Sequence, residues 1–406
     1  MKEPVQKSPL YQNFHRYVAQ TSSEPLDIEI DKAESIYIYD VSGKSYIDLI
    51  SGISVCNLGH SHPHIIEAVR KQIEHYMHVM VYGELIQSPQ VELASLLCNY
   101  LPENLSSVFF VNSGSEAVEG GLKLAKRVTG RRELIHCVNA YHGSSHGALS
   151  MMGNENYKSA FLPLLPETKA IRFGSIEDLE LITNKTAAFI VESVQGENGV
   201  RIAPKAYWQA VRQRCNETGA MLILDEIQTG MGRTGKLFAF EHYDIVPDIL
   251  LLAKAFGGGM PLGAFISSPQ NMHFLTHDPI LGHISTFGGH PVSCAAALAH
   301  LQIITEQKLW ERADSIGKQL ENILLQQPHV KEVRRIGLMM AVEYGDTALN
   351  LETCHQYIQA GLFIDWFLFC DTAMRIAPPL IMTDDDLEKV KERLLTLSQQ
   401  KIKTDL

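Results

Sequence analysis

The chain alternates short apolar runs with stretches of helical character, and this alternation restricts its fold more than any other feature. The apolar runs are SVFFV, ELIHCV, AAFIVESV, AMLILDEI, DILLLA and GAFISS. A strand that is apolar on both faces is buried on both sides, which is typical of a parallel sheet covered by helices. The sequence therefore predicts an α/β fold with a mostly parallel sheet. In such folds, ligands bind beyond the carboxyl ends of the strands.

The pattern changes near residue 300, which predicts a second, smaller α+β domain. Residues 302–326 have the periodicity of one long helix, and residues 330–344 and 373–381 resemble strands. The segment TDDDLEKVKERLLTLSQQ predicts a final helix whose first turn is capped by Thr383. We therefore expect helices and strands to be mixed in this part of the chain.

The N-terminal segment IYIYDVSGKSYIDLISG predicts a β-hairpin that turns at Ser42 and Gly43. We expect residues 1–55 to pack with the small domain, which comprises residues 300–406. Residues 56–299 would then form the large domain.

Charge and cysteine content exclude several classes of protein. The formal net charge of −11 disfavours non-specific binding to nucleic acid and to anionic membranes. The seven cysteines are scattered and form no C-x-x-C pair, so we expect neither a disulfide framework nor a metal site. The N-terminus lacks the apolar core of a signal peptide, and no apolar run is long enough to span a bilayer. We therefore expect a cytoplasmic protein without membrane or nucleic-acid partners.

Lys254 is the strongest candidate for a chemical role. It follows the apolar run DILLLA and precedes three glycines, Gly257 to Gly259. Lysine is almost never buried without a partner or a covalent use, and burial favours the neutral amine that attacks an aldehyde. The alternative is a lysine at a strand end whose amine reaches solvent.

Asp225 is the second candidate, at the end of the apolar run AMLILDEI. A buried carboxylate needs a compensating positive charge, and a protonated pyridine nitrogen would supply one and keep the ring an electron sink. Gln228 is close enough to donate to a ring oxygen, and Ile227 could pack against a flat ring. The alternative is that Asp225 only caps a helix.

Two further candidates follow other apolar runs. Gly114 and Ser115 open a helix after SVFFV and could present backbone N–H groups and a hydroxyl to an anion. Tyr141 follows ELIHCV and could stack on a ring, although it could equally be a core residue. His142 beside it has no second ligand at metal spacing. An amine, an acid, an anion cradle and an aromatic ring are thus all expected at one edge of the sheet.

Nearly the whole chain resembles the class III, or ornithine/ω-amino acid type, aminotransferases, which have fold type I and use pyridoxal phosphate. The resemblance rests on the motifs LGHSHP, NSGSEAVE, YHG, VESVQGENGV, LDEIQTGMGRTGK, LLAKAFGGGMPLGA, STFGGHP, RRIGLMM and RIAPPL. The segment that contains Asp225 and Lys254 is highly specific to this family.

The resemblance implies a role for each candidate toward pyridoxal phosphate. Lys254 would carry the cofactor as a Schiff base, and Asp225 would bind the pyridine nitrogen. The remaining cofactor-binding residues would be Gly114, Ser115, Tyr141, His142, Glu192, Ile227, Gln228 and Thr286. In this family the threonine reaches the phosphate from the partner subunit, which implies a homodimer with shared active sites.

The resemblance also implies how substrates bind. Arg375 would hold the α-carboxylate of the keto acid, Glu197 would pair with Arg375 when that carboxylate is absent, and Ile53 would form an apolar wall. The alternative is a fixed structural ion pair. Two positions depart from the family pattern: His290 replaces a usual asparagine, and Ser144 replaces an arginine that holds a substrate carboxylate in ornithine and acetylornithine aminotransferases.

The sequence thus predicts a ping-pong aminotransferase that moves an amino group from a terminal (ω) amine of an amino acid or its derivative to a keto acid such as 2-oxoglutarate. An isomerase (aminomutase) or a decarboxylase on the same scaffold is the alternative, because all of these enzymes share the cofactor residues. A non-catalytic binding protein is a third possibility, which the completeness of the site disfavours.

Overall fold

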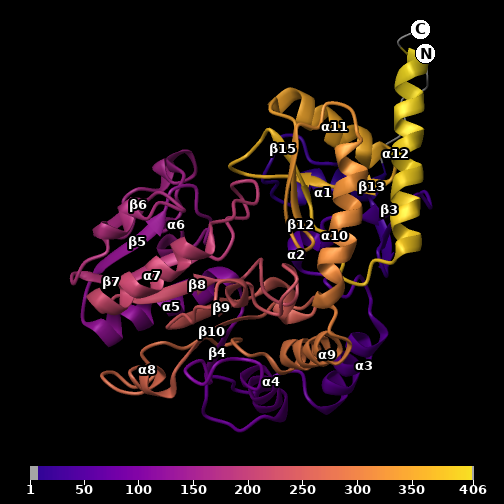
Figure 1. Cartoon of the computed structure of the whole chain (residues 1–406). Helices are drawn as coiled ribbons and strands as arrows, with labels where there is room; N and C mark the ends of the chain where they lie inside the picture. Colours follow the sequence, from indigo (N-terminus) through magenta and orange to yellow (C-terminus); the bar gives the residue numbers. More distant parts are fainter. Residues whose placement is uncertain (1–7, 405–406) are drawn as a thin grey trace.

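A seven-stranded sheet forms the centre of the larger lobe in the computed structural model, which describes residues 8–404 and the side chains of residues 8–397 (Figure 1). Its strand order is β4-β10-β9-β8-β7-β5-β6. The strands are β4 (Ser107–Val111), β5 (Glu133–Cys137), β6 (Thr168–Ile171), β7 (Thr186–Glu192), β8 (Met221–Asp225), β9 (Ile249–Leu252) and β10 (Gly263–Ser267).

The sheet is mostly parallel, as predicted, with one reversed strand. β5 to β9 pair in parallel, whereas β10 is antiparallel to both of its neighbours, β4 and β9. Two reversals restore the direction, so β4 runs the same way as β9. The carboxyl ends of six strands therefore lie at the same edge of the sheet, which is where α/β folds bind ligands.

Helices cover the sheet because its strands are apolar on both faces. One of them, α5 (Gly114–Thr129), packs on β9 and β10. Gly120 of α5 lies directly against the ring of Phe265, so a side chain at this position would overlap the ring. The other helices of this lobe are α3 (Pro63–His75), α4 (Ser88–Cys98), α6 (His146–Ser150), α7 (Lys205–Thr218), α8 (Pro269–His273) and α9 (Pro291–Gln307), with 3-10 turns η1 (Glu155–Tyr157), η2 (Ser159–Phe161), η3 (Glu177–Leu181), η4 (Ala239–His242) and η5 (Lys254–Gly257).

A second lobe holds a four-stranded antiparallel sheet of order β11-β12-β15-β14 (Figure 1). Its strands are β11 (Glu332–Ile336), β12 (Met339–Glu343), β14 (Asp365–Trp366) and β15 (Ala373–Ile376), and its helices are α10 (Trp310–Leu325), α11 (Thr347–Gln359) and α12 (Asp384–Thr404). The predicted cap of the final helix is confirmed: the Thr383 hydroxyl accepts a hydrogen bond from the Asp386 N–H at 3.2 Å. The prediction of one long helix over residues 302–326 is wrong, because α9 ends at Lys308, whose backbone is left-handed with φ of 45°.

The predicted N-terminal hairpin is present as β2 (Tyr37–Asp40) and β3 (Ser45–Asp48), with the Gly43 N–H donating to the Asp40 carbonyl across the turn. Its sheet, β1-β2-β3-β13, joins β1 (Ile30–Glu34) to β13 (Leu362–Phe363), so the hairpin contacts the C-terminal part of the chain. Two short helices, α1 (Pro9–Tyr17) and α2 (Ser51–Ser54), flank it.

The division into domains at residues 55/56 and 299/300 stays a prediction, because α9 runs through residue 300 and packs on α3 and α4. Residues 1–7, which belong to the stretch without a signal-type apolar core, lie outside the described residues.

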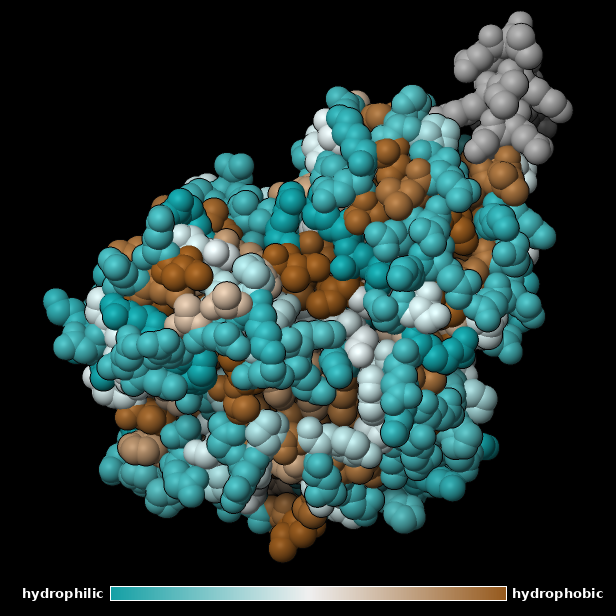
Figure 2. Space-filling model, viewed as in Figure 1, coloured by the Kyte–Doolittle hydropathy of each residue, from teal (hydrophilic) through white to brown (hydrophobic). Residues whose placement is uncertain are grey.

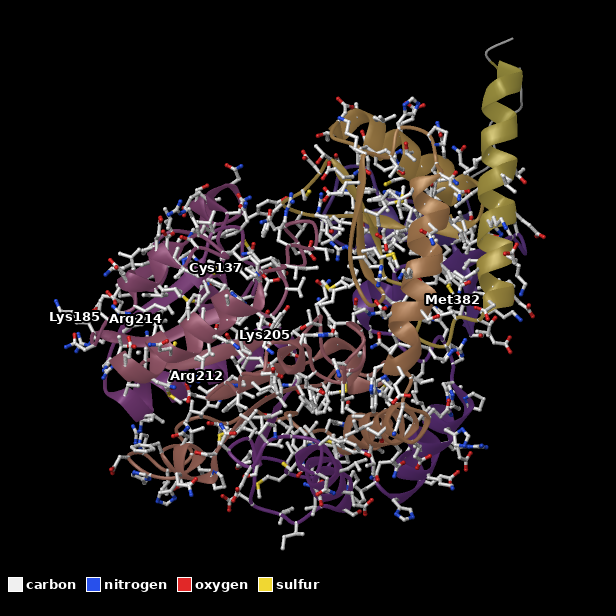
Figure 3. All side chains as sticks on the ribbon, viewed as in Figure 1. Cys137, Lys185, Lys205, Arg212, Arg214 and Met382 are labelled. Carbon is white, nitrogen blue, oxygen red and sulfur yellow. The ribbon has the colours of Figure 1, made fainter. Side chains whose placement is uncertain are left out.

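The two lobes share a continuous apolar core. Cys137 lies inside the larger lobe and Met382 near the start of α12 (Figure 3), and both belong to the same hydrophobic cluster. This continuity holds the edge of the large sheet in a fixed position relative to β15. Within residues 8–404, no helix is long and apolar enough to cross a membrane.

Candidate active site

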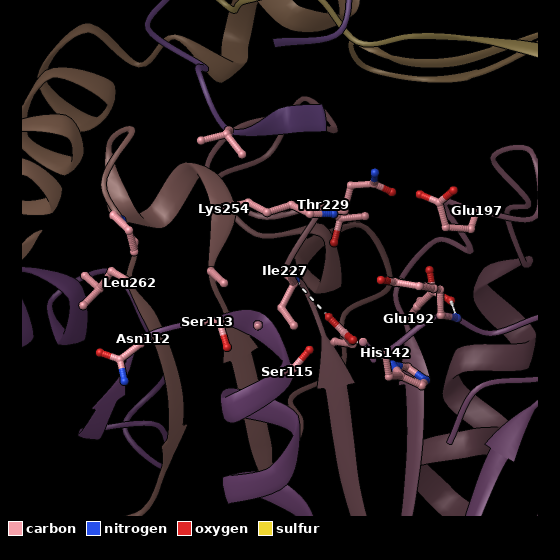
Figure 4. A pocket seen from close by; sticks show the side chains of 18 of the residues that line it. Asn112, Ser113, Ser115, His142, Glu192, Glu197, Ile227, Thr229, Lys254 and Leu262 are labelled. Carbon is pink, nitrogen blue, oxygen red and sulfur yellow. Dashed lines mark hydrogen bonds and ion pairs between the residues drawn. The ribbon is translucent and has the colours of Figure 1, made fainter. Parts of the chain in front are cut away.

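A cavity of about 360 Å³ lies at the carboxyl edge of the large sheet (Figure 4). The loops that follow β4, β5, β7, β8 and β9 all contribute to its lining. Ten predicted site residues line it: Gly114, Ser115, Tyr141, His142, Glu192, Glu197, Asp225, Ile227, Gln228 and Lys254. The sheet thus brings together residues that are up to 140 positions apart in sequence, as the motif positions predicted.

Lys254 extends across the cavity from the turn after β9 (Figure 4). Its backbone has a φ of 50°, in the left-handed region that non-glycine residues rarely adopt, so local strain is present at this residue. Burial lowers the pKa of its amine and the charge of Arg375 lowers it further, while Glu197 and Asp225 oppose this shift. Lys254 is half-buried and lines the cavity, so the alternative of an amine that reaches solvent is not decided by its position.

Asp225 forms a hydrogen bond with a histidine that the sequence did not pair with it. His142 Nδ1 lies 2.7 Å from Asp225 Oδ2, and both side chains are buried. The other carboxylate oxygen accepts from the Ile227 N–H at 3.0 Å. A turn and not a helix directly follows β8, so the alternative role of Asp225 as a helix cap is wrong. The carboxylate is thus held at both oxygens at the cavity wall.

Glu192 lines the cavity beside His142 and Asp225. Its two carboxylate oxygens accept the N–H groups of Tyr141 and Gly196, each at 2.9 Å. Burial raises the pKa of Glu192 to about 7, and the nearby Asp225 adds to this. Glu192 therefore fixes the backbone of the Tyr141 loop next to His142.

The start of α5 forms an anion cradle at one end of the cavity. The Ser113 hydroxyl caps the helix by accepting the Glu116 N–H at 3.2 Å. Ser115 accepts the Ser144 N–H at 3.3 Å, and Gly143 packs closely on Ser115. Helix N-termini favour anions because their first N–H groups lack partners within the helix.

Ile227 packs closely on Gly114, whose added Cβ would lie 3.0 Å from the Ile227 Cδ1 atom. Gln228 contacts Gly196 so closely that a side chain there would overlap it. Together with Tyr141, these residues line a slot between the anion cradle and Asp225. The slot has an apolar wall and polar ends.

Arg375 on β15 does not line the cavity itself but forms an ion pair with Glu197, which does. Its Nη2 lies 2.6 Å from Glu197 Oε2 and donates to the Trp366 carbonyl at 3.2 Å. Both charged side chains are buried, with exposed fractions of 4% and 6%. Nε and Nη1 of Arg375 are buried without a partner, and the guanidinium lies 4.8 Å from the Phe367 ring centre. Glu197 Oε2 also accepts the Leu368 N–H at 3.2 Å.

Three predicted residues are not among those that line this cavity: Thr286, Ile53 and Arg375, which pairs with the lining residue Glu197. Thr286 is exposed, and Ile53 is half-buried on a backbone with φ of 64°. Val55, Asn112 and Thr229 line it without having been predicted. The His142–Asp225 bond was also missed, because His142 follows β5 and Asp225 ends β8, and β7 lies between these two strands in an order that the sequence does not give.

The arrangement fits a planar, anionic aldehyde cofactor. The amine of Lys254 can react with an aldehyde, the start of α5 can hold an anion, and the buried Asp225 can pair with a cationic ring nitrogen. Within the described part of the chain, no group of three or more His, Cys, Asp or Glu residues could hold a metal ion.

Comparison with known proteins agrees with this chemistry. The family described as aminotransferase class-III matches residues 17–397. Acetylornithine aminotransferases of Methanopyrus kandleri and Methanocaldococcus jannaschii are 41% and 39% identical over 89% of this chain, and the alignments cover 92% and 91% of those proteins.

The solved structures that resemble this chain are also aminotransferases. The ornithine aminotransferase of Toxoplasma gondii superposes with a TM-score of 0.89 at 28% identity, over 97% of this chain and 95% of that one. A second structure of an ornithine aminotransferase from this organism is described with pyridoxal phosphate at its active site. A transaminase from the marine bacterium Virgibacillus has a TM-score of 0.87 at 27% identity and covers 96% of this chain and 98% of that one. The chain therefore belongs to the class-III aminotransferases, and its cofactor is pyridoxal phosphate.

Proposed function

We propose that this aminotransferase moves an amino group from a terminal (ω) amine of an amino acid or its derivative to a keto acid, in two half-reactions of ping-pong order. The buried Glu197–Arg375 pair beside Lys254 carries this proposal. The relatives named acetylornithine and ornithine aminotransferase support it. None of the proteins compared above is an aminomutase or a decarboxylase.

Lys254, Asp225 and the start of α5 would hold the cofactor at three points. Lys254 would bind its aldehyde carbon, Asp225 its ring nitrogen, and Gly114 and Ser115 its phosphate. The short His142–Asp225 contact would orient the carboxylate toward the ring nitrogen.

The cofactor ring would lie in the slot next to Asp225. Ile227 and Tyr141 would contact its two faces, Gln228 would donate to its hydroxyl group, and Glu192 would fix the Tyr141 loop. Bound there, the cofactor supplies an electron sink for negative charge that develops at the substrate carbon.

Lys254 would act as the general base and acid of both half-reactions. Burial lowers the pKa of its amine, which favours the neutral form that could take a proton from the substrate carbon and return it. Lys254 lines the same cavity as the residues of the slot, which supports this role.

Glu197 would control access to Arg375. When the two are paired, the guanidinium is neutralised and the site admits a donor whose reacting carbon bears no carboxylate. When a keto acid enters, its carboxylate would take the guanidinium from Glu197. The unpartnered Nε and Nη1 of Arg375 support this role, because a carboxylate can accept two parallel hydrogen bonds from an arginine. A charge-assisted bond contributes about 1.5–3 kcal/mol, which allows partners to exchange.

The donor's distal end would meet a site without the arginine that ornithine and acetylornithine aminotransferases use. Ser144 stands at that position, with its Oγ 3.5 Å from the Tyr141 hydroxyl oxygen. Ile53, in the N-terminal wall, adds no charge. The proposal therefore covers the class of ω-amine donors and names no single donor.

The two half-reactions of Glu197→Ala test the proposal. Without Glu197, Arg375 stays charged and unpaired, so we expect a weaker half-reaction with terminal amines and a stronger one with α-amino acids such as glutamate. Stopped-flow absorbance of the cofactor measures each half-reaction separately.

Glu343→Gln is the matched control, because Glu343 also pairs with an arginine, Arg334, at 2.9 Å but does not line the cavity. This variant should leave the ratio of the two half-reactions unchanged. Parallel changes in both half-reactions of Glu197→Ala, or no change in either, would mean that Glu197 and Arg375 form a fixed ion pair.

The enzyme would act as a homodimer that shares its active sites between subunits. Thr286 is exposed and is not among the residues that line its own cavity, although Ser285 beside it accepts a hydrogen bond at 2.8 Å from the cavity residue Asn112. Exposed apolar side chains surround it in sequence: Ile280, Leu281, Ile284 and Phe287. The surface also has an apolar projection below α4 (Figure 2). Exposed apolar groups of this kind are often covered by a partner.

The cytoplasm would be the compartment, because all seven cysteines are free thiols and five of them are buried. Free thiols persist where the environment is reducing.

A further inference from the structure

Arg233 is a buried charge that the proposed half-reactions do not use. It has an exposed fraction of 0%, and its Nε is buried without a partner. Burial lowers the pKa of its guanidinium to about 9, which still leaves the group charged at neutral pH. Burying a charge costs free energy, so stability alone does not explain an arginine at this position.

The guanidinium donates to four neutral oxygens from two other parts of the chain. Nη1 donates to the carbonyl oxygens of Leu338 at 3.0 Å and Pro378 at 2.5 Å. Nη2 donates to Asn57 Oδ1 and to Ser51 Oγ, which lies 3.5 Å away. Arg233 thus joins the loop that follows β8 to the segment that follows β3 and to strand ends of the second lobe.

Two of these acceptors lie beside the strand that carries Arg375. Leu338 directly precedes β12, and Pro378 is the second residue after β15. β12 and β15 are paired antiparallel strands, so these two residues lie at the same end of the pair. Because Arg233 donates to both from one planar group, it fixes where β15 lies relative to the loop that follows β8.

The segment that follows β3 holds the same strand through its own contacts. Ser51 Oγ donates to the Ala377 carbonyl at 2.8 Å, and the Ala377 N–H donates to the Leu49 carbonyl at 2.6 Å. Ser51 and the three residues after it all have a positive φ, between 51° and 64°. Such a run persists only where surrounding contacts hold it. It leads directly into Val55, which lines the active-site cavity.

We propose that Arg233 is a positioning residue for the acceptor half-reaction, because it fixes Arg375 relative to the cofactor site. This inference rests on the proposed function, in which Arg375 holds the carboxylate of the keto acid. Arg375 lies only three positions before Pro378, so a shift of this strand end would move its guanidinium relative to Lys254. The planar fork of an arginine reaches all four oxygens, whereas a lysine has a single nitrogen.

The cofactor end of the same loop is held by other contacts. Glu226 accepts the N–H groups of Ala239 and Phe240 at 2.7 and 2.6 Å and the Ser193 hydroxyl at 2.9 Å. These bonds do not involve Arg233. Loss of its guanidinium should therefore disturb the keto-acid end of the site more than the cofactor end.

Binding of glutarate to the holoenzyme tests the position of Arg375 without turnover. Glutarate has two carboxylates but no keto group, so it cannot accept the amino group, and calorimetry gives its dissociation constant. We expect Arg233→Lys to weaken glutarate binding about tenfold, because a small misplacement of a binding group has a large effect. An unchanged dissociation constant in folded Arg233→Lys would overturn the inference.

Arg393→Lys is the matched control. Arg393 is half-buried and donates to neutral oxygens as well: the carbonyl oxygens of Ser45 and Gly361 and the Ser45 hydroxyl. Its acceptors lie in β3 and next to β13 rather than beside β15. This variant should lower the free energy of unfolding but leave glutarate binding unchanged. Equal weakening in Arg233→Lys and Arg393→Lys would mean that the second lobe is merely loosened, and would refute a positioning role.

The acceptor half-reaction separates positioning from structural support. Enzyme loaded with pyridoxamine phosphate needs no amine donor, and stopped-flow absorbance follows its single turnover with 2-oxoglutarate. In Arg233→Lys, the half-saturating concentration of 2-oxoglutarate should rise about tenfold, whereas the limiting rate should stay unchanged. A lower limiting rate at an unchanged half-saturating concentration would contradict the inference.

Arg375→Gln distinguishes this inference from the proposed function on which it rests. If Arg375 holds the keto-acid carboxylate, this variant should weaken glutarate binding at least as much as Arg233→Lys does. Weakening by Arg375→Gln alone would rule out the positioning role and leave the proposed function standing. No weakening by Arg375→Gln would contradict the proposed function itself.

Ser51→Ala replaces Arg233→Lys if the latter does not fold. It removes the hydrogen bond to the Ala377 carbonyl and one acceptor of the Arg233 guanidinium, so a smaller loss of glutarate binding in the same direction is expected. Unchanged glutarate binding in Ser51→Ala would then decide against the inference.

Discussion

The burial of Asp225 could be predicted from the sequence, whereas its hydrogen-bond partner could not. Its place after an apolar run predicted a buried carboxylate, and the structure confirms the burial at the cavity wall. The contact with His142 was not predictable from spacing, because the two residues lie 83 positions apart and follow different strands. Which side chains meet across a sheet edge depends on the order of the strands, which a strand's own sequence does not encode.

We expect Asp225→Ala to keep its fold and to lose about a hundred- to a thousandfold in kcat. His142→Leu should lose about ten- to a hundredfold, since it acts by orienting Asp225. In the Asp225→Ala background, His142→Leu should cause no further loss, because its effect requires the carboxylate. Steady-state kinetics and circular dichroism measure these effects.

Glu226 offers the control for this prediction. It is as buried as Asp225, but its carboxylate accepts the N–H groups of Ala239 and Phe240 instead of lining the cavity. Glu226→Gln should therefore lower stability more than it lowers kcat. Additive losses for Asp225→Ala and His142→Leu would show that His142 does not act through Asp225.

At the level of elements, the position of every strand in the large sheet except β6 could be read from apolar runs. The direction of β10 could not, because an apolar run looks the same in either orientation. β6 was missed because two of its four residues are exposed, so it lacks a continuous apolar run. These errors did not move the site, because the six strands other than β10 end at one edge of the sheet.

The break between α9 and α10 has a specific local cause. Lys308 ends α9 in a left-handed conformation that sequence periodicity does not reveal, since lysine favours helices. A non-glycine residue in this conformation costs about 1–2 kcal/mol relative to the right-handed one. Glycine adopts it without that cost and is the usual residue after a helix end.

We therefore expect Lys308→Gly to stabilise the protein by about 1 kcal/mol, which chemical denaturation of the apoenzyme would measure. Lys318→Gly is the matched control: Lys318 is an exposed residue inside α10, where glycine should destabilise by about 1 kcal/mol. Destabilisation by both substitutions would mean that the backbone at Lys308 is not left-handed in solution.

At the scale of the whole molecule, the site depends on contacts between lobes. Glu197 lies in the turn after β7 and Arg375 lies on β15, 178 positions away, yet their atoms approach to 2.6 Å. Apolar periodicity predicted both lobes but not how they meet, and only the family resemblance indicated this pairing. Thr286 does not line the cavity of its own chain, and in the proposed homodimer it would reach the active site of the partner.

Subunit mixing tests whether Thr286 serves the partner's site. Lys254→Ala and Thr286→Val should each be nearly inactive alone. In a hybrid dimer, the site that keeps Lys254 receives an intact Thr286 from the other chain, so one of its two sites is complete. Random exchange makes half of the dimers hybrids, so we expect recovery of about a quarter of wild-type activity in such two-fold assemblies.

If Thr286 instead served its own chain, every site in the mixture would lack either Lys254 or Thr286, and no activity would return. Full activity of Thr286→Val alone would show that neither chain uses this residue.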